Sequence, residues 1–179
     1  MERSTIQQLR GYNLVGEYDK LFKGYSQILS QNTIKVSAKL FDPLLYACDA
    51  LRDYELSKEV INHMRSRNIV PTESGCALYI KSLSESGDVH TALQFYREIK
   101  KDMAFKTDQV FLALMKGLQM KQDLIGASQV FNDLLQLKIP VRSADFWHPL
   151  LKVQSIESFY LLLLVSWSSC PIRRISKIV

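Results

Sequence analysis

Basic side chains recur at a fixed distance along this chain of 179 residues. Lys81 and Lys116 stand 35 residues apart, so they occupy equivalent points if the chain repeats at that length. A row of lysines suits the phosphates of a polyanion, and Lys39 and Arg142 can add to the same row. The other interpretation is an ordinary solvated surface, on which these side chains bind nothing.

The residues that carry most enzyme chemistry are few and scattered. The three cysteines, Cys48, Cys76 and Cys170, form no Cys-x-x-Cys pair and share no metal-ligand spacing with the histidines. No Asp cluster for two metal ions, no deaminase signature and no phosphate-cradling glycine loop is present. The sequence therefore predicts no enzyme, no metal and no cofactor. Cys48 and Cys76 are expected to be buried, reduced thiols.

Composition and charge indicate a soluble globular protein. The chain is 47% hydrophobic and 23% charged, and its formal charge of +5 permits a polyanionic partner without requiring one. The apolar run 159–165 is shorter than the ~20 residues that span a bilayer, so no membrane partner is predicted. The first residues include Glu2 and lack a long acid-free amphipathic run, so a transit peptide is not evident.

The lysine pair belongs to a wider periodicity of 35 residues. Setting Ala92 over Ala127 also places Tyr79 over Leu114 and Tyr96 over Phe131. Three consecutive units follow, at 38–72, 73–107 and 108–142, and residues 1–37 read as a partial or degenerate unit. A fixed period of this length is typical of solenoids. We therefore expect an all-α fold, an α-solenoid of stacked antiparallel helix hairpins.

Each unit divides into two amphipathic helices joined by a short polar turn. In the first helix, apolar residues recur at i, i+3, i+4 and i+7, which gives a stripe wide enough to bury. These stripes are Phe41, Leu44, Leu45 and Cys48; Cys76, Tyr79, Ile80 and Leu83; and Phe111, Leu114, Met115 and Leu118. An aspartate in each turn (Asp53, Asp88, Asp123) can cap the second helix, and a small residue (Ser57, Ala92, Ala127) lets the two helices approach.

A second set of side chains shares the opposite face of the first helices. Residues 2, 5, 9 and 12 of a helical unit lie on one side, away from the apolar stripe. In the three units they are Lys39, Asp42, Tyr46 and Asp49; Ser74, Ala77, Lys81 and Ser84; and Gln109, Leu112, Lys116 and Gln119. Stacked units are expected to present them as a ladder along a shared polar groove.

The segment 143–179 departs from the repeat. It contains an unbroken apolar block and ends in a basic stretch with Arg173 and Arg174. Two interpretations stay open: a capping helix that buries the exposed face of the last unit, or intron sequence translated past a splice junction near Lys152-Val153.

The assembled features resemble the pentatricopeptide repeat (PPR) family, in particular its P-type repeats. The likeness rests on the 35-residue unit, on Gly87-Asp88 at the interhelix turn and on the closing segment 64–72. Tetratricopeptide repeats compete less well, because their period is 34 and they favour alanine where Met64, Ile99 and Leu134 stand. The small number of units indicates a fragment or a truncated gene model.

The resemblance implies binding of single-stranded RNA, with about one base read per repeat by two or three side chains. In this family the second, fifth and last residues of each repeat contact the base. The second residues here are Lys39, Ser74 and Gln109, and the fifth/last pairs are Asp42/Thr72, Ala77/Thr107 and Leu112/Arg142. Ala77 and Leu112 offer no hydrogen bond, which argues against base-by-base recognition.

The resemblance further implies a role in organellar RNA processing, stability or translation, in mitochondria or chloroplasts. Single-stranded RNA is the expected partner, protein partners are possible, and no small-molecule substrate is expected. The competing hypothesis is a protein-binding helical scaffold within a larger assembly, which the poor base-reading pairs and modest charge favour.

Overall fold

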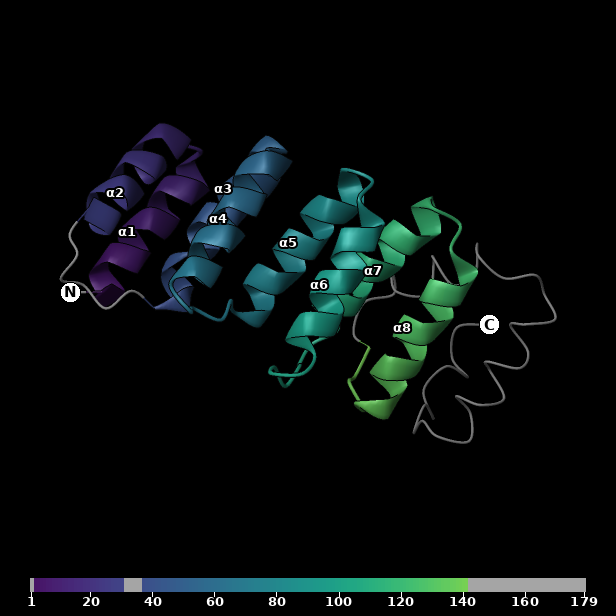
Figure 1. The fold of residues 1–179 in the computed structure, drawn as a ribbon. Coiled ribbons are helices and arrows are strands. Elements are labelled where there is room, and N and C mark those ends of the chain that lie inside the picture. Colours follow the sequence, from purple (N-terminus) through teal and green to yellow (C-terminus); the bar gives the residue numbers. More distant parts are fainter. Residues whose placement is uncertain (1, 31–36, 142–179) are drawn as a thin grey trace, which may run out of the picture.

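The computed structural model describes residues 2–30 and 37–141, and this part of the chain contains helices and no strand. The helices are α1 (Glu2–Val15), α2 (Tyr18–Ser30), the short 3-10 helix η1 (Ala38–Leu40), α3 (Asp42–Leu51), α4 (Tyr54–Ser66), α5 (Glu73–Glu85), α6 (Val89–Ile99), α7 (Gln109–Met120) and α8 (Leu124–Gln136). Consecutive helices form hairpins, and the hairpins follow one another in a row from α1/α2 to α7/α8 (Figure 1).

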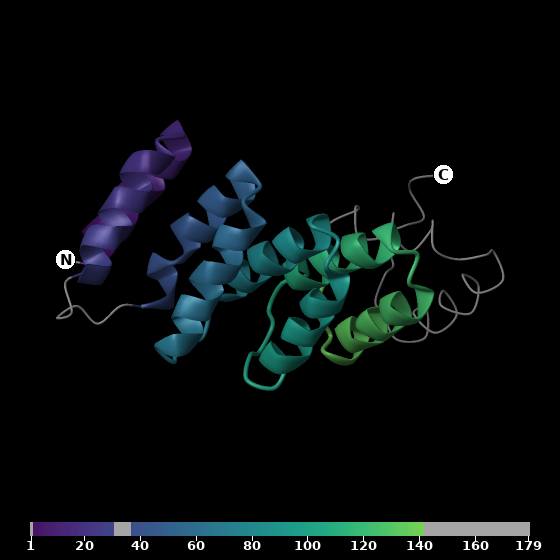
Figure 2. The ribbon, with the colours of Figure 1, turned by 45° about the horizontal axis from the view of Figure 1, so that its top comes forward.

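The row is a solenoid in which neighbouring hairpins lean on each other. The first helices α1, α3, α5 and α7 pack side by side, and each second helix also contacts the first helix of the next hairpin. The same succession of pairs is seen from another direction in Figure 2. This arrangement confirms the predicted all-α solenoid. The exact unit boundaries and the segment 143–179, which lies outside the described residues, stay predictions.

The predicted apolar stripes form the core between hairpins. All twelve stripe residues, eleven on α3, α5 and α7 and Phe41 just before α3, are buried, Tyr79 being the most accessible at 5%. Burying one such side chain contributes about 1.5–3 kcal/mol, and a single hairpin has no partner for both of its faces. Stacking is therefore what makes the individual hairpins stable.

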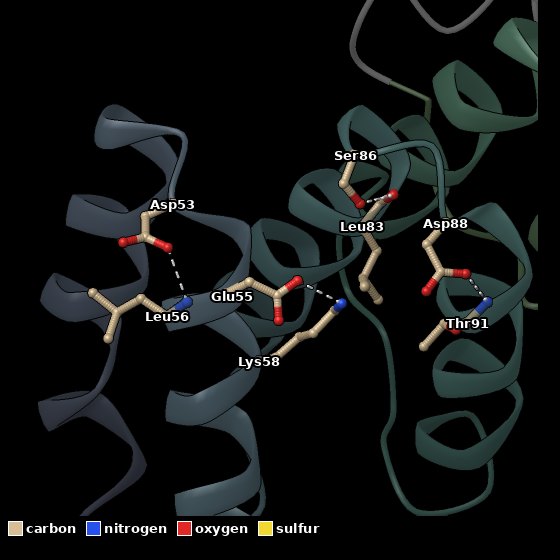
Figure 3. A network of polar contacts seen from close by, with 8 residues as sticks. All are labelled: Asp53, Glu55, Leu56, Lys58, Leu83, Ser86, Asp88 and Thr91. Atoms are coloured by element: carbon tan, nitrogen blue, oxygen red, sulfur yellow. Dashed lines mark hydrogen bonds and ion pairs between the residues drawn. The ribbon is translucent and has the colours of Figure 1, made fainter.

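The turns inside the hairpins are held by side-chain caps. Asp53 accepts a hydrogen bond from the backbone N–H of Leu56 at 3.0 Å, and Asp88 accepts one from Thr91 at 3.2 Å (Figure 3). Asp123 accepts from Gly126 at 2.9 Å. Each bond satisfies a free amide at the N-terminus of a second helix, as the sequence predicted.

The hairpin turns also require a left-handed residue. Gly87 takes φ 87°, which glycine adopts without strain, whereas Arg52 and Gln122 take φ 54° and 55° at the equivalent points. The position is therefore a property of the repeat; among the units 38–72, 73–107 and 108–142 the middle one has a glycine there, and the α1/α2 turn likewise has Gly16 at φ 74°.

The first helix of the unit 38–72 differs from its counterparts. The equivalent helix α5 begins at Glu73, 35 residues after Ala38, but in this unit η1 covers Ala38–Leu40 and α3 begins at Asp42. Pro43 is the cause, because it lacks a backbone N–H and fits only the first turn of an α-helix. No helix among the described residues has the length and apolarity needed to cross a membrane.

Candidate functional site

A groove of about 230 Å³ runs across the first helices α3, α5 and α7. It is lined by seven residues of the face that the sequence singled out and by three others. The seven are Tyr46, Ser74, Ala77, Lys81, Gln109, Leu112 and Lys116; the others are Leu78, Glu85 and Ala113. The structure thus brings together side chains from three helices, because equivalent faces of stacked helices turn the same way.

The fifth and last residues of the unit 38–72 bond to each other. The hydroxyl of Thr72 donates to the carboxylate of Asp42 at 2.6 Å and accepts from the backbone N–H of Gly75 at 3.0 Å. Asp42 is only 8% exposed, and this burial raises its pKa although the Thr72 bond opposes the shift. Asp42 is therefore engaged within the protein in this unit, because its side chain lies in the contact between α3 and α5. Its expected role in RNA binding stays a prediction.

The last residue of the unit 73–107 is likewise engaged within the protein. The Thr107 hydroxyl and backbone N–H both donate to Glu73 Oε1 at 2.7 Å. The backbone N–H of Lys106 donates to the same carboxylate. Ala77, the fifth residue of this unit, lines the groove with 8% of its surface exposed. Its position is nearly closed, because the adjacent first helices cover it.

Lys81 does not present a free charge to the groove. Its ammonium lies 2.8 Å from Asp49 Oδ2 and 3.8 Å from Glu85 Oε1. Partial burial lowers the pKa of Lys81, but the hydrogen bond and the charges of the two carboxylates outweigh it, so the pKa lies above its ordinary value. Two carboxylates around one ammonium leave this part of the groove without net positive charge.

Lys116 has a different environment although it occupies the equivalent position. It is exposed, and no carboxylate oxygen of the described residues lies within 4.0 Å of its ammonium. Lys39 is exposed but does not line the groove, and neither Asp42, Thr72 nor Thr107 is among its lining residues. Arg142, the last residue of the third unit, lies outside the described residues.

The groove residues that the face pattern missed had a signal in the sequence. Leu78 and Ala113 are both the sixth residue of their units, next to the fifth residues that the pattern selected. Glu85 lies four residues after Lys81 on the same helix, which is the spacing of a helical ion pair. The face pattern therefore identified the ladder residues but not neighbours such as Glu85, which offsets the charge of Lys81.

The described residues carry little that is reactive. Among them, no group of three or more His, Cys, Asp and Glu side chains is placed to hold a metal ion. Cys48 and Cys76 are free and buried, and burial raises the pKa of each thiol to about 12. The expectation that these two thiols are buried is confirmed.

Comparison with known proteins places this chain beside helical-repeat proteins, although no protein-family model matches it. A mitochondrial pentatricopeptide repeat-containing protein of Arabidopsis thaliana is 29% identical, over 41% of this chain and 18% of the relative.

Among solved structures, the nuclear proteinaceous RNase P 2 of A. thaliana matches with a TM-score of 0.73 at 17% identity, over 92% of this chain and 38% of that one. The pentatricopeptide repeat protein PPR10 from maize matches at 0.65 and 13% identity, over 92% of this chain and 23% of that one. A structure of PPR10 with an 18-nucleotide psaJ RNA element matches with a TM-score of 0.69 at 14% identity, over 94% of this chain and 24% of that one. The chain therefore spans well under half the length of each of these proteins.

Proposed function

Because the chain fits a pentatricopeptide repeat protein in sequence and in fold, we propose that it binds single-stranded RNA in the groove across α3, α5 and α7. The observation that carries this proposal is the gathering of six ladder residues from α5 and α7 in one groove, with the open cation Lys116 among them. The likeness to a repeat protein solved with RNA adds support.

The proposed mechanism is occupancy. A strand held in the groove is shielded from other factors or kept from pairing, which requires no chemical step from the protein. The related mitochondrial protein supports an organellar setting, mitochondrial or chloroplast, in RNA processing, stability or translation. We propose no catalytic activity for the chain: it binds the RNA strand and does not cleave it.

A protein-binding scaffold is the second candidate, and two observations favour it. The hydroxyls of Thr72 and Thr107 donate to carboxylates of the protein itself, which removes donors that a base edge would need. The groove floor also includes the apolar side chains of Leu78, Leu112 and Ala113, which suit a helix or an extended peptide.

The two candidates differ in how binding responds to salt. Each phosphate contact to a single strand adds about −0.7 to the slope of log K against log salt, whereas apolar contact with a peptide adds little. We expect a labelled, mixed-sequence single-stranded RNA to bind in a fluorescence anisotropy titration at two salt concentrations, with a measurable slope. A duplex of the same sequence is the control. No binding of either RNA at low salt contradicts the proposal and favours the scaffold.

A further inference from the structure

The fifth and last residues, to which the resemblance assigns base contact, are closed or engaged within the protein in the first two units. Asp42 and Thr72 are bonded to each other, and Thr107 is bonded to Glu73. Ala77 has neither exposure nor a polar group to offer. A ligand in the groove must therefore be held mainly by other side chains.

The ninth residues of the units are open instead. Tyr46, Lys81 and Lys116 come one each from α3, α5 and α7, and all three line the same groove. The exposed fraction is 53% for Tyr46 and 45% for the Lys81 side chain, and Lys116 is also exposed. They lie one helical turn beyond the fifth residues, where the neighbouring helices no longer cover them.

The neighbours of the two lysines explain why their charges differ. The carboxylates that bind Lys81 come from the twelfth residue of the preceding unit, Asp49, and the thirteenth of its own, Glu85. The same two places around Lys116 hold Ser84 and Met120, which carry no charge. One repeat position therefore has a neutralised cation on α5 and, on α7, a cation without a carboxylate partner among residues 2–30 and 37–141.

Tyr46 supplies a different kind of contact at the other end of the row. An exposed aromatic ring on a groove wall is a stacking surface for any base, and such stacking is tolerant of sequence. Adjacent helix axes lie about 8–10 Å apart, so Tyr46 and Lys116 are separated by about two helix spacings. A ligand that touches both is longer than one nucleotide.

We infer that this groove holds its strand through the ninth residues, with Tyr46 stacking on a base and Lys116 binding a phosphate farther along, while Lys81 is withheld by Asp49 and Glu85. This inference rests on the proposed function. It predicts that the groove binds a short stretch of RNA with little dependence on base sequence. The strand lies in one orientation, with a base at the Tyr46 end and a phosphate at the Lys116 end.

The two ends can be separated with two probes: a short single-stranded RNA and the same ribose-phosphate backbone without bases. Tyr46→Leu is expected to weaken binding of the RNA by about tenfold and to leave the abasic strand unchanged, because only bases stack. Tyr46→Phe keeps the ring and should bind RNA like the wild type. Circular dichroism checks that each variant is folded.

Lys116→Gln is expected to weaken both probes and to lower the salt slope by about 0.7, the value of one single-strand phosphate contact. Lys101→Gln is the matched control, because Lys101 is exposed, has no carboxylate partner among the described residues and lies outside the groove. Lys81→Gln should change the slope by less than Lys116→Gln does.

The restraint on Lys81 provides a gain-of-function test. Asp49→Asn with Glu85→Gln removes both carboxylates yet leaves acceptors for the ammonium, so the salt slope and the affinity should rise. Met120→Glu places a carboxylate four residues from Lys116 and should weaken both probes.

The outcomes separate the inference from the function on which it depends. Binding of RNA by the wild type that is lost in Thr107→Val but unchanged in Tyr46→Leu and Lys116→Gln overturns the inference and leaves RNA binding intact. No RNA binding by the wild type overturns both. The inference is supported if Tyr46→Leu weakens binding of the RNA but not of the abasic strand, and Lys116→Gln weakens binding of both.

Discussion

The two junctions that join α3/α4 to α5/α6 and α5/α6 to α7/α8 use the same repeat positions with different chemistry. Where α7/α8 meets α5/α6, three rings pack together: Tyr96 and Phe105 are stacked at 5.9 Å, and Phe111 meets each of them edge-on at 5.6 Å. The equivalent residues where α5/α6 meets α3/α4 are Ile61, Val70 and Cys76, and Val70 is 60% exposed.

The polar contacts on the second helices differ in the same way. Arg65 and Glu98 form an ion pair at 2.6 Å with half of each side chain exposed, and Lys100 with Asp133 is its equivalent one unit later. At the later junction Asp133 also accepts from the hydroxyl of Tyr96 at 3.0 Å, whereas Ile61 at the earlier one has no hydroxyl to offer. The junction of α5/α6 with α7/α8 is therefore the stronger of the two.

The two junctions share the geometry of helix stacking but differ in the interaction energy that stabilises them. The helices stack alike at both places, but aromatic pairs add about 0.5–1.5 kcal/mol each beyond their buried area, and exposed ion pairs add about 0–1 kcal/mol. In a solenoid, stability is a sum over such interfaces, so hairpins can open one at a time. We expect α3/α4 to separate from α5/α6 before α7/α8 does.

Phe111→Ala should have the largest effect on this difference. The ring is fully buried between two other rings, and removing it costs about 3–5 kcal/mol through lost packing and the cavity that remains. Cys76→Ala at the equivalent point is the matched control, with an expected cost of about 1 kcal/mol, because a thiol fills far less volume. Urea unfolding, followed by hydrogen exchange of the α7 amides, measures both. Equal costs would refute the ranking of the junctions.

Gly117→Ala tests how closely α7 lies on α5. A methyl group at this position would stand 2.5 Å from Ser84 Oγ and 2.7 Å from its Cβ, so the helices must move apart. We expect a net loss of about 1–2 kcal/mol in the free energy of unfolding, after the gain from better helix propensity.

Gly11→Ala is the control for that substitution. Gly11 is also inside a helix, but nothing lies within 4 Å of an added methyl group. It should stabilise the protein by about 0.5–1 kcal/mol. Thermal unfolding of the two variants compares them directly, and a gain at both positions would show that α7 has room to spare.

Asp42→Asn should strengthen the weaker junction, by of the order of 1 kcal/mol at neutral pH. Asparagine still accepts from Thr72 but carries no charge into the contact between α3 and α5. Burial raises the pKa of Asp42 in the folded protein, so folding favours its protonated form. The contribution of Asp42 to the free energy of unfolding is therefore fully present below the unfolded pKa of about 3.8, and it is lost as the pH rises through the folded pKa.

The advantage of Asp42→Asn over the wild type should consequently shrink as the pH falls from 7 toward and below the ordinary aspartate range. Urea midpoints of both proteins from pH 7 to pH 3 measure it. An advantage that is constant across this range would mean that the charge of Asp42 is not what limits the junction.

Arg65→Gln should have the smallest effect, about 0.2–1 kcal/mol, although its ion pair is short. Both partners are half exposed, and Arg65 also lies 5.3 Å from the centre of the Phe95 ring. The change should shrink further in high salt. Measuring the loss of stability at two salt concentrations checks this, and a loss equal to that of Phe111→Ala would reverse the comparison.

Much of the fold could be predicted from the sequence, because it depends on periodic apolar residues. The stripes on α3, α5 and α7 and the caps Asp53, Asp88 and Asp123 follow from local spacing alone. The 3-10 turn before Pro43 does not follow from the repeat frame, because it depends on the missing N–H of one residue.

The site was predicted less completely, because its chemistry depends on pairs that are distant in sequence. Lys81 and Asp49 are 32 residues apart, and their contact is set by the stacking of two units. The bond between Asp42 and Thr72, across 30 residues, likewise follows from how α5 docks on α3. A face pattern shows which side chains share a side, but it does not show which of them are already bonded to each other.

Glu73 binds the backbone of Lys106 and Thr107, so the first helical turn of the middle unit holds the linker that closes it. The two ends of this block of the chain consequently meet in space. A segment whose ends meet can be inserted or deleted as a whole unit without displacing the adjacent units. This closure gives a physical route by which such an array lengthens or shortens during evolution, one whole unit at a time.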